Sequence, residues 1–206
     1  MDAAAQAGLF EEAAVWLRKM KEAGLEPTEY TFGTVMNACA RAGRADEAIG
    51  WLREMEASQV RPNLVCYSAV IDACAKAGRA AAAGDWLGLM ESSRIQPDVI
   101  TYSSVVDAHA QLGDAAEAAN WLLKIEALGL SPNVITYNSV IAACARVGHA
   151  AKAAEWLTRM EDKSIKPNLA SYSAMLDALA KSKAGKTGEA VEWFRKIEKA
   201  GCSGHL

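Results

Sequence analysis

The sequence predicts an all-α fold, a solenoid of stacked antiparallel helix-turn-helix repeats, from three periodic observations. All five prolines of the 206-residue chain recur at one interval of 35 residues. A tryptophan and a glycine recur at the same interval, and an aromatic residue follows each proline by five positions. A fixed period between about 20 and 50 residues is typical of repeats that bury their apolar faces against one another. The prolines are Pro27, Pro62, Pro97, Pro132 and Pro167, and the aromatic residues are Phe32, Tyr67, Tyr102, Tyr137 and Tyr172.

The period continues from one end of the chain to the other without a low-complexity linker, which predicts one domain over residues 1–206. In the last repeat, Gly185 and Trp193 come two positions later than the period requires, so we expect one insertion near Ser182. The array comprises a partial repeat (1–28), four complete repeats (29–63, 64–98, 99–133 and 134–168) and a degenerate repeat (169–206).

Each repeat is predicted to form two helices. In repeat 64–98, apolar residues are spaced i, i+3, i+4, i+7 on both sides of Gly78, which is the pattern of one helix face. Glycine tolerates the left-handed backbone that ends a helix, and Pro97 stops the second helix. We therefore expect twelve helical segments and no strand. The residues expected to be largely buried are Tyr67, Tyr102, Tyr137, Trp86, Trp121 and Trp156.

Composition and cysteine spacing exclude several function classes. The net charge is −3, and no apolar run approaches the roughly 18 residues that cross a membrane. Cys39, Cys74 and Cys144 share one position of the period, which indicates small core side chains rather than metal ligands. No nucleophile–base–acid set is visible. We expect no metal, no cofactor, no small-molecule substrate and no enzymatic activity, and cysteine use weakly favours a reducing compartment.

The first helix of each repeat carries a second, polar stripe. In repeat 64–98 this stripe is Ser68, Asp72 and Lys76, at i, i+4 and i+8. Stacked helices would align such residues in a ladder of small polar groups edged by a basic row. The alternative interpretation is a solvated helix face held by i, i+4 ion pairs such as Asp72 with Lys76.

The residues of repeat 134–168 run V-I-T-Y-N-S-V-I, then G, then A-A-E-W-L-T-R-M, then K-P-N, and the junction between repeats recurs along essentially the whole chain. This pattern closely resembles the pentatricopeptide repeat. The resemblance implies a right-handed superhelix that binds single-stranded RNA along its concave face. Such modules read about one base per repeat with two or three side chains.

The resemblance also implies which side chains contact RNA. One base-reading residue follows the repeat aromatic, and its partner follows the proline that closes the same repeat. A third residue, two positions before the aromatic, clamps the bases, and a basic row contacts phosphates. The reading pairs are Gly33 with Asn63, Ser68 with Asp98, Ser103 with Asn133, and Asn138 with Asn168, followed by Ser173; the clamps are Tyr30, Val65, Ile100, Ile135 and Ala170; the phosphate contacts are Arg41, Lys76, Arg146 and Lys181.

The chemistry of these pairs predicts a base preference. An ionised aspartate can only accept hydrogen bonds, whereas an asparagine both donates and accepts. An acceptor suits the imino N–H of guanine or uracil, and an amide suits adenine or cytosine. In the family, a small hydroxyl residue after the aromatic favours purines and asparagine there favours pyrimidines. The pairs of repeats 64–98, 99–133 and 134–168 therefore predict G, then A, then C or U.

Three functions remain open at this stage. The first is a sequence-selective RNA-binding module in organellar RNA processing, stability or translation. The second is a protein-interaction scaffold or structural subunit of an organellar ribosome or membrane-associated complex. The third is the RNA-targeting arm of an enzyme whose catalytic domain lies outside this chain. The resemblance implies a mitochondrion or chloroplast, although we expect no targeting peptide in these 206 residues.

Overall fold

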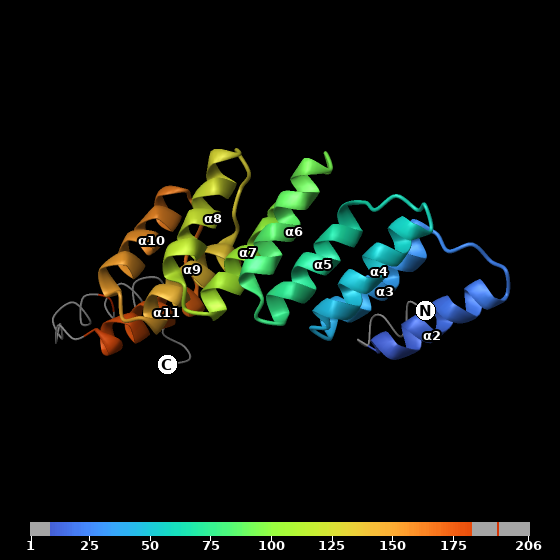
Figure 1. The fold of residues 1–206 in the computed structure, drawn as a ribbon. Helices are drawn as coiled ribbons and strands as arrows, with labels where there is room; N and C mark the ends of the chain where they lie inside the picture. The colour runs from blue at the N-terminus through green and yellow to red at the C-terminus, as the bar shows by residue number, and fades with distance from the viewer. Residues whose placement is uncertain (1–8, 183–192, 194–206) are drawn as a thin grey trace. The chain divides into compact units, whose positions relative to one another are not determined.

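The computed structural model describes residues 9–182 and residue 193, and within them every regular element is an α-helix. Ten helices of 13 residues follow one another in the described residues (Figure 1). The expected segments before residue 9 and beyond residue 182 lie outside the described residues. The helices are α2 (Phe10–Glu22), α3 (Glu29–Arg41), α4 (Ala45–Ala57), α5 (Leu64–Lys76), α6 (Ala80–Ser92), α7 (Val99–Gln111), α8 (Ala115–Ala127), α9 (Val134–Arg146), α10 (Ala150–Asp162) and α11 (Leu169–Lys181).

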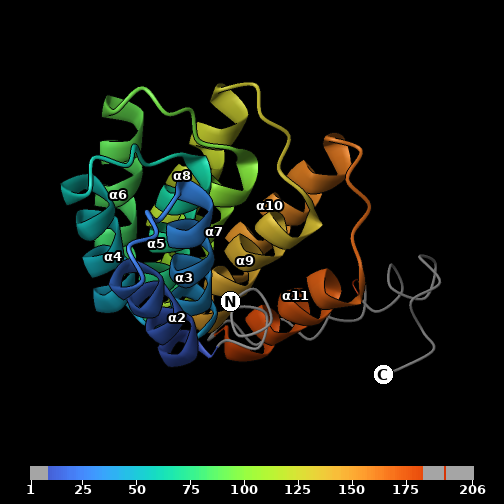
Figure 2. The ribbon, with the colours of Figure 1, turned by 90° about the vertical axis from the view of Figure 1, so that its right-hand side faces the viewer.

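The chain divides into two compact units, Met1–Ala108 and His109–Leu206, and the boundary falls within α7. In the first unit, α3 packs against α5, and α4 contacts both of these helices. In the second unit, α9 packs against α8, α10 and α11 (Figure 2). Each unit is thus a stack of helical hairpins in which the first helices of successive repeats lie side by side.

The residue that follows a proline caps each described first helix, which begins one residue later. The side chains of Thr28, Asn63 and Asn168 each accept a hydrogen bond from the backbone N–H three residues on. Asp98 and Asn133 accept the equivalent bonds at the starts of α7 and α9. Such N-caps satisfy N–H groups that a helix leaves unpaired at its start. All of these capping residues except Thr28 are second members of the proposed reading pairs.

The helices α3, α5, α7 and α9 end two residues before the repeat glycines, and Gly148 shows why glycine is needed there. Its φ is +69°, in the left-handed region. A Cβ at this position would lie 2.9 Å from the carbonyl oxygen of Lys181, at the end of α11. Any side chain would therefore meet both backbone strain and the neighbouring helix.

The core contains the repeat aromatic residues and the thiols that were predicted to lie there. Phe32 and Tyr137 are fully buried. Cys39, Cys74 and Cys144 are buried free thiols, and burial raises the pKa of Cys39 to about 11.

Trp86, Trp121 and Trp156 are largely buried as predicted, although less completely than Tyr67, Tyr102 and Tyr137. One side of the Trp156 indole packs against Tyr137, with ring centroids 6.4 Å apart. Arg159 lies 5.6 Å from the Trp156 ring centroid, and Lys124 lies 5.0 Å from that of Trp121. The indoles of Trp121 and Trp156 thus lie at the margin of the core beneath cationic side chains, an arrangement that is favourable without complete burial.

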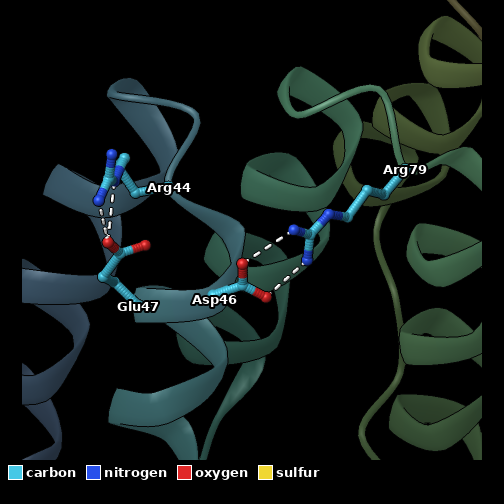
Figure 3. A network of polar contacts seen from close by, with 4 residues as sticks. All are labelled: Arg44, Asp46, Glu47 and Arg79. Atoms are coloured by element: carbon cyan, nitrogen blue, oxygen red, sulfur yellow. Dashed lines mark hydrogen bonds and ion pairs between the residues drawn. The ribbon is translucent and has the colours of Figure 1, made fainter.

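Ion pairs link the second helices of successive repeats. Arg79, at the start of α6, donates two hydrogen bonds of 2.6 and 2.8 Å to the Asp46 carboxylate on α4 (Figure 3). Arg44 pairs with Glu47 one turn away on the same helix. The Arg79 guanidinium lowers the pKa of Asp46. These exposed pairs lie on the second helices, away from the polar stripe of the first helices.

Candidate nucleic-acid interface

In the first unit, the reading pair Ser68 and Asp98 is joined by a third side chain, that of Thr101. The Thr101 hydroxyl lies 2.7 Å from Ser68 Oγ and donates to Asp98 Oδ1 at 2.7 Å. The Thr101 backbone N–H donates to the same Oδ1 at 2.8 Å. Ser68 lies on α5, and the other two residues begin α7, so neighbouring repeats build one continuous polar chain.

These residues form the polar floor of a pocket of about 350 Å³. Asn37 from α3 and Asp72 from α5 extend this floor. Val65 and Ile100, two of the predicted clamps, also line the pocket, and both are exposed. The pocket combines hydrogen-bonding groups with apolar side chains at its rim, which suits a flat, polar-edged ligand.

In the second unit, Asn138, Asn168 and Ser171 form the equivalent site. Asn138 Nδ2 donates to Asn168 Oδ1 at 3.1 Å. The Ser171 hydroxyl donates to Asn138 Oδ1 at 2.6 Å, and it lies 3.1 Å from Asn168 Oδ1. The Ser171 backbone N–H also donates to Asn168 Oδ1, at 3.1 Å. The two reading residues of this repeat therefore contact each other directly as well as through a hydroxyl.

Helix capping decides which atoms of each pair remain for a ligand. In Asp98 and Asn168 alike, Oδ1 accepts the capping N–H. Asp98 is left with Oδ2, which only accepts, and Asn168 is left with its Nδ2 amide, which only donates. The oxygen of Asn168 thus accepts bonds within the protein, and its Nδ2 amide is the group available to a ligand.

The remaining reading positions differ in what they present. Gly33 has no side chain, although a Cβ there would lie in ordinary contact with Val65 at 3.6 Å, and its partner Asn63 caps α5. The Ser103 hydroxyl donates to the Val99 carbonyl of its own helix at 2.7 Å. Asn133 caps α9 in the second unit. Ser173 lies exposed on α11.

The predicted clamps lie at the surface beside the reading residues. Ile100 and Ile135 are each 69% exposed, which leaves most of an apolar side chain in water. Tyr30, Val65 and Ala170 are exposed as well. Their position two residues before the buried aromatic places them on the first turns of α3, α5, α7, α9 and α11.

The basic row is not a row of unpaired cations. Lys76 Nζ lies 2.7 Å from Asp72, and Lys181 Nζ lies 2.6 Å from Asp177, each pair one turn apart on one helix. Arg146 donates to the backbone carbonyl of Gln111. Arg41 is exposed at the end of α3. The i, i+4 pairs of the alternative interpretation are present, so a phosphate at Lys76 would compete with a carboxylate.

Across residues 9–182 and 193, no group of three or more His, Cys, Asp or Glu side chains could hold a metal ion. None of the ten described helices has the length and apolar character to cross a membrane.

Family models match most of the chain. The PPR repeat family matches residues 32–76, 62–111 and 132–181, and the PPR repeat matches residues 1–25, 100–130 and 170–202. The chain therefore belongs to the pentatricopeptide repeat family. Comparison with curated proteins finds no match.

Solved structures confirm the fold class. Pentatricopeptide repeat protein PPR10 from maize is 34% identical, with a TM-score of 0.70 over 92% of this chain. The same protein in complex with an 18-nt psaJ RNA element gives 22% identity over 89% of this chain and a TM-score of 0.73. The PPR domain of Arabidopsis thaliana protein-only RNase P 1, in complex with tRNA, gives 16% identity over 87% of this chain and 94% of that one, with a TM-score of 0.74. The match spans 27% of PPR10 in both of its structures.

Sequence reasoning missed the hydroxyls of Thr101 and Ser171. A signal for them is present in the period, because Thr31, Thr101, Thr136 and Ser171 all stand directly before the repeat aromatic. Each is also the third residue of its helix, where a hydroxyl can bond back to the N-cap. Cys66 occupies this position in α5, and its thiol lies 3.6 Å from Met55 Sδ instead.

Proposed function

We propose that this chain is a single-stranded RNA-binding module that reads about one base per repeat. The observation that carries the proposal is the pocket of the first unit, where Asp98 and Ser68 form a polar floor between Val65 and Ile100. A base has a flat apolar face and a hydrogen-bonding edge, and single-stranded RNA exposes both. The RNA and tRNA complexes of the two structural relatives support the same class of ligand.

The atoms left by capping give the first unit a preference for guanine. Asp98 Oδ2 is an acceptor, and it suits the imino N–H of guanine or uracil. The small Ser68 side chain leaves room for a purine, as small hydroxyl residues do in the family. We therefore propose G at this repeat.

The second unit presents a donor where the first presents an acceptor. Asn168 Nδ2 suits the unprotonated ring nitrogen of cytosine and conflicts with the imino N–H of uracil. Asparagine at position 138 favours a pyrimidine, as it does in the family. The structure thus supports C over U, a choice that the sequence left open. We propose that RNA runs with its 5′ end toward the N-terminal repeats, as in the family.

The rest of the proposal follows from the family. Arg41, Lys76, Arg146 and Lys181 would contact phosphates, which position the RNA without specifying its sequence. We propose that the chain itself is not an enzyme and that it acts in a mitochondrion or chloroplast. The clamps, reading pairs and basic residues all lie on first helices or at their starts, which supports one binding face per unit.

The test is a binding titration of short single-stranded RNAs that differ only at the base facing Ser68 and Asp98. Wild type should prefer G, and Asp98→Asn should shift this preference to A by about tenfold, because the remaining acceptor becomes a donor. Asp46→Asn is the matched control, since Asp46 pairs with Arg79 on the second helices.

Two results would contradict the proposal. If neither protein binds RNA above background at low salt, the scaffold interpretation gains support. If both proteins bind but ignore the base, the reading pairs have been assigned wrongly.

A further inference from the structure

We infer that, for each reading pair, a hydroxyl on the first helix of the next repeat decides whether the pair presents donors or acceptors to a base. This hydroxyl belongs to the third residue of that helix. In the first unit this positioning residue is Thr101, and in the second it is Ser171. The inference rests on the proposed RNA binding and adds a residue to each pair. These hydroxyls would not touch RNA; they would act through the side chains that do.

In the first unit the direction of each hydrogen bond follows from proton counting. The Thr101 hydroxyl has one proton, and the Asp98 carboxylate can only accept, so that proton goes to Asp98 Oδ1. Thr101 must then accept the bond from Ser68, whose oxygen lies 2.7 Å away. Ser68 therefore donates its only hydroxyl proton to Thr101, and its oxygen lone pairs remain available to a ligand in the pocket.

The pocket of the first unit therefore presents two acceptors, Ser68 Oγ and Asp98 Oδ2. Guanine has two adjacent donors on its Watson–Crick edge, the N1–H and the N2 amino group. Uracil has one donor, N3–H, flanked by two carbonyl acceptors. Two acceptors consequently select guanine over uracil, and aspartate alone does not make this distinction.

In the second unit, the hydroxyl at the same position leaves the reading residues with donors instead of acceptors. The Ser171 hydroxyl donates to Asn138 Oδ1 at 2.6 Å, which holds this oxygen away from a ligand. The Asn138 amide nitrogen then faces Asn168 Oδ1 at 3.1 Å and keeps its second N–H for a base. Both reading residues therefore present donors, which match the ring nitrogen and carbonyl of cytosine.

Burial allows the hydroxyls of Thr101 and Ser171 to hold the reading side chains in one orientation. Thr101 is 1% exposed and Ser171 is fully buried, so water does not compete for their hydrogen bonds. A buried hydroxyl must be satisfied by the protein, and its few partners leave it one orientation. The first complete repeat agrees with this interpretation, because it has Cys66 at the position and Gly33, with no side chain to orient, as its reading residue.

The first experiment removes the hydroxyl. Thr101→Val should lower the ratio of affinities for G and U at this base about fivefold, because Ser68 regains a proton to donate. Thr101→Ser should retain the wild-type ratio, since the hydroxyl remains. Ser92→Ala is the matched control on α6 of the same unit, outside the pocket, where the Ser92 hydroxyl bonds the carbonyl of Leu89. Thermal unfolding of each variant checks that the fold is intact.

The second experiment introduces a hydroxyl at position 66, where the chain has a cysteine. Its result does not depend on whether Thr101→Val folds. Gly33 has room for a Cβ, and serine closely matches the volume of Cys66. Gly33→Ser alone should discriminate only weakly between bases at the position that this residue and Asn63 would read. Gly33→Ser combined with Cys66→Ser should favour A at that base by about fivefold more, because the pair then presents one acceptor and one donor.

The outcomes separate this inference from the proposed function. If wild type discriminates bases but Thr101→Val retains its G to U ratio, the hydroxyl has no positioning role and RNA reading stands. An identical preference in the single and double variants at position 33 would overturn the inference in the same way. If wild type binds no RNA, the proposed function and the inference both fail.

Discussion

The two units place the same three positions in the same arrangement, yet they present opposite chemistry. The first unit combines Ser68, Thr101 and Asp98, and it leaves acceptors toward the pocket. The second combines Asn138, Ser171 and Asn168, and it leaves donors. In both units the N-cap consumes one oxygen of the second reading residue. The comparison teaches that the repeat fixes where the atoms lie, and that hydrogen bonds from the N-cap and from the neighbouring repeat leave different atoms available in each unit.

The largest expected effect is on the stability of the fold, at the glycines that follow the first helices. A Cβ at Gly148 would lie 2.9 Å from the Lys181 carbonyl, whereas one at Gly43 would approach Lys76 no closer than 3.7 Å. Both glycines have positive φ. Gly148→Ala should therefore cost about 3 kcal/mol and Gly43→Ala about 1 kcal/mol in free energy of unfolding, measured by urea denaturation. Equal costs would show that the second unit tolerates the contact by shifting α11.

The next effect tests the polarity of the second unit directly. Asn168→Asp keeps the capping oxygen and replaces the remaining donor with an acceptor. The preferred base should change from C to U by roughly five- to tenfold in a titration of paired RNAs. Asn120→Asp is the matched control, because Asn120 is exposed on α8 and bonds Glu117 of the same helix. A retained preference for C would mean that Asn168 does not face the base.

The smallest effect on stability concerns the carboxylates that accept hydrogen bonds from the buried repeat tyrosines. Tyr137 donates to Glu126, which also pairs with Arg159, whereas Tyr102 donates to Glu91. The Glu126 side chain is 7% exposed, and burial alone would raise its pKa, but the bonds from Arg159 and Tyr137 outweigh this and lower the pKa. A lowered carboxylate pKa stabilises the fold above the unfolded pKa of about 4.3, and this stability is lost as pH falls through the folded value.

Glu126→Gln should therefore cost about 1 kcal/mol in free energy of unfolding at neutral pH. The difference from wild type should shrink as the pH falls below about 4.3. Denaturation at several pH values measures this, with Glu91→Gln, at an exposed residue, as the control. A difference that is constant with pH would rule out a role for the Glu126 charge.

Local patterns predicted most of the fold. The residues at the helix starts and the buried aromatic row were predicted because each follows from spacing within one repeat. The tryptophans were assigned to the core from helix periodicity, but periodicity cannot show that Lys124 or Arg159 lies over the indole. The pairing of Lys76 with Asp72 was visible in the sequence as one of two interpretations.

The sequence by itself determined the repeat, its two helices and the glycine and proline positions that end them. These depend on hydrogen bonds and apolar spacing within a few turns of the chain, which the order of residues encodes directly. Only the tertiary structure decided the polarity of each pair. Thr101 and Ser68 are 33 residues apart, as are Ser171 and Asn138, so the bonds that orient them exist only when neighbouring repeats pack. The donor or acceptor that faces a ligand is what remains after those bonds are made.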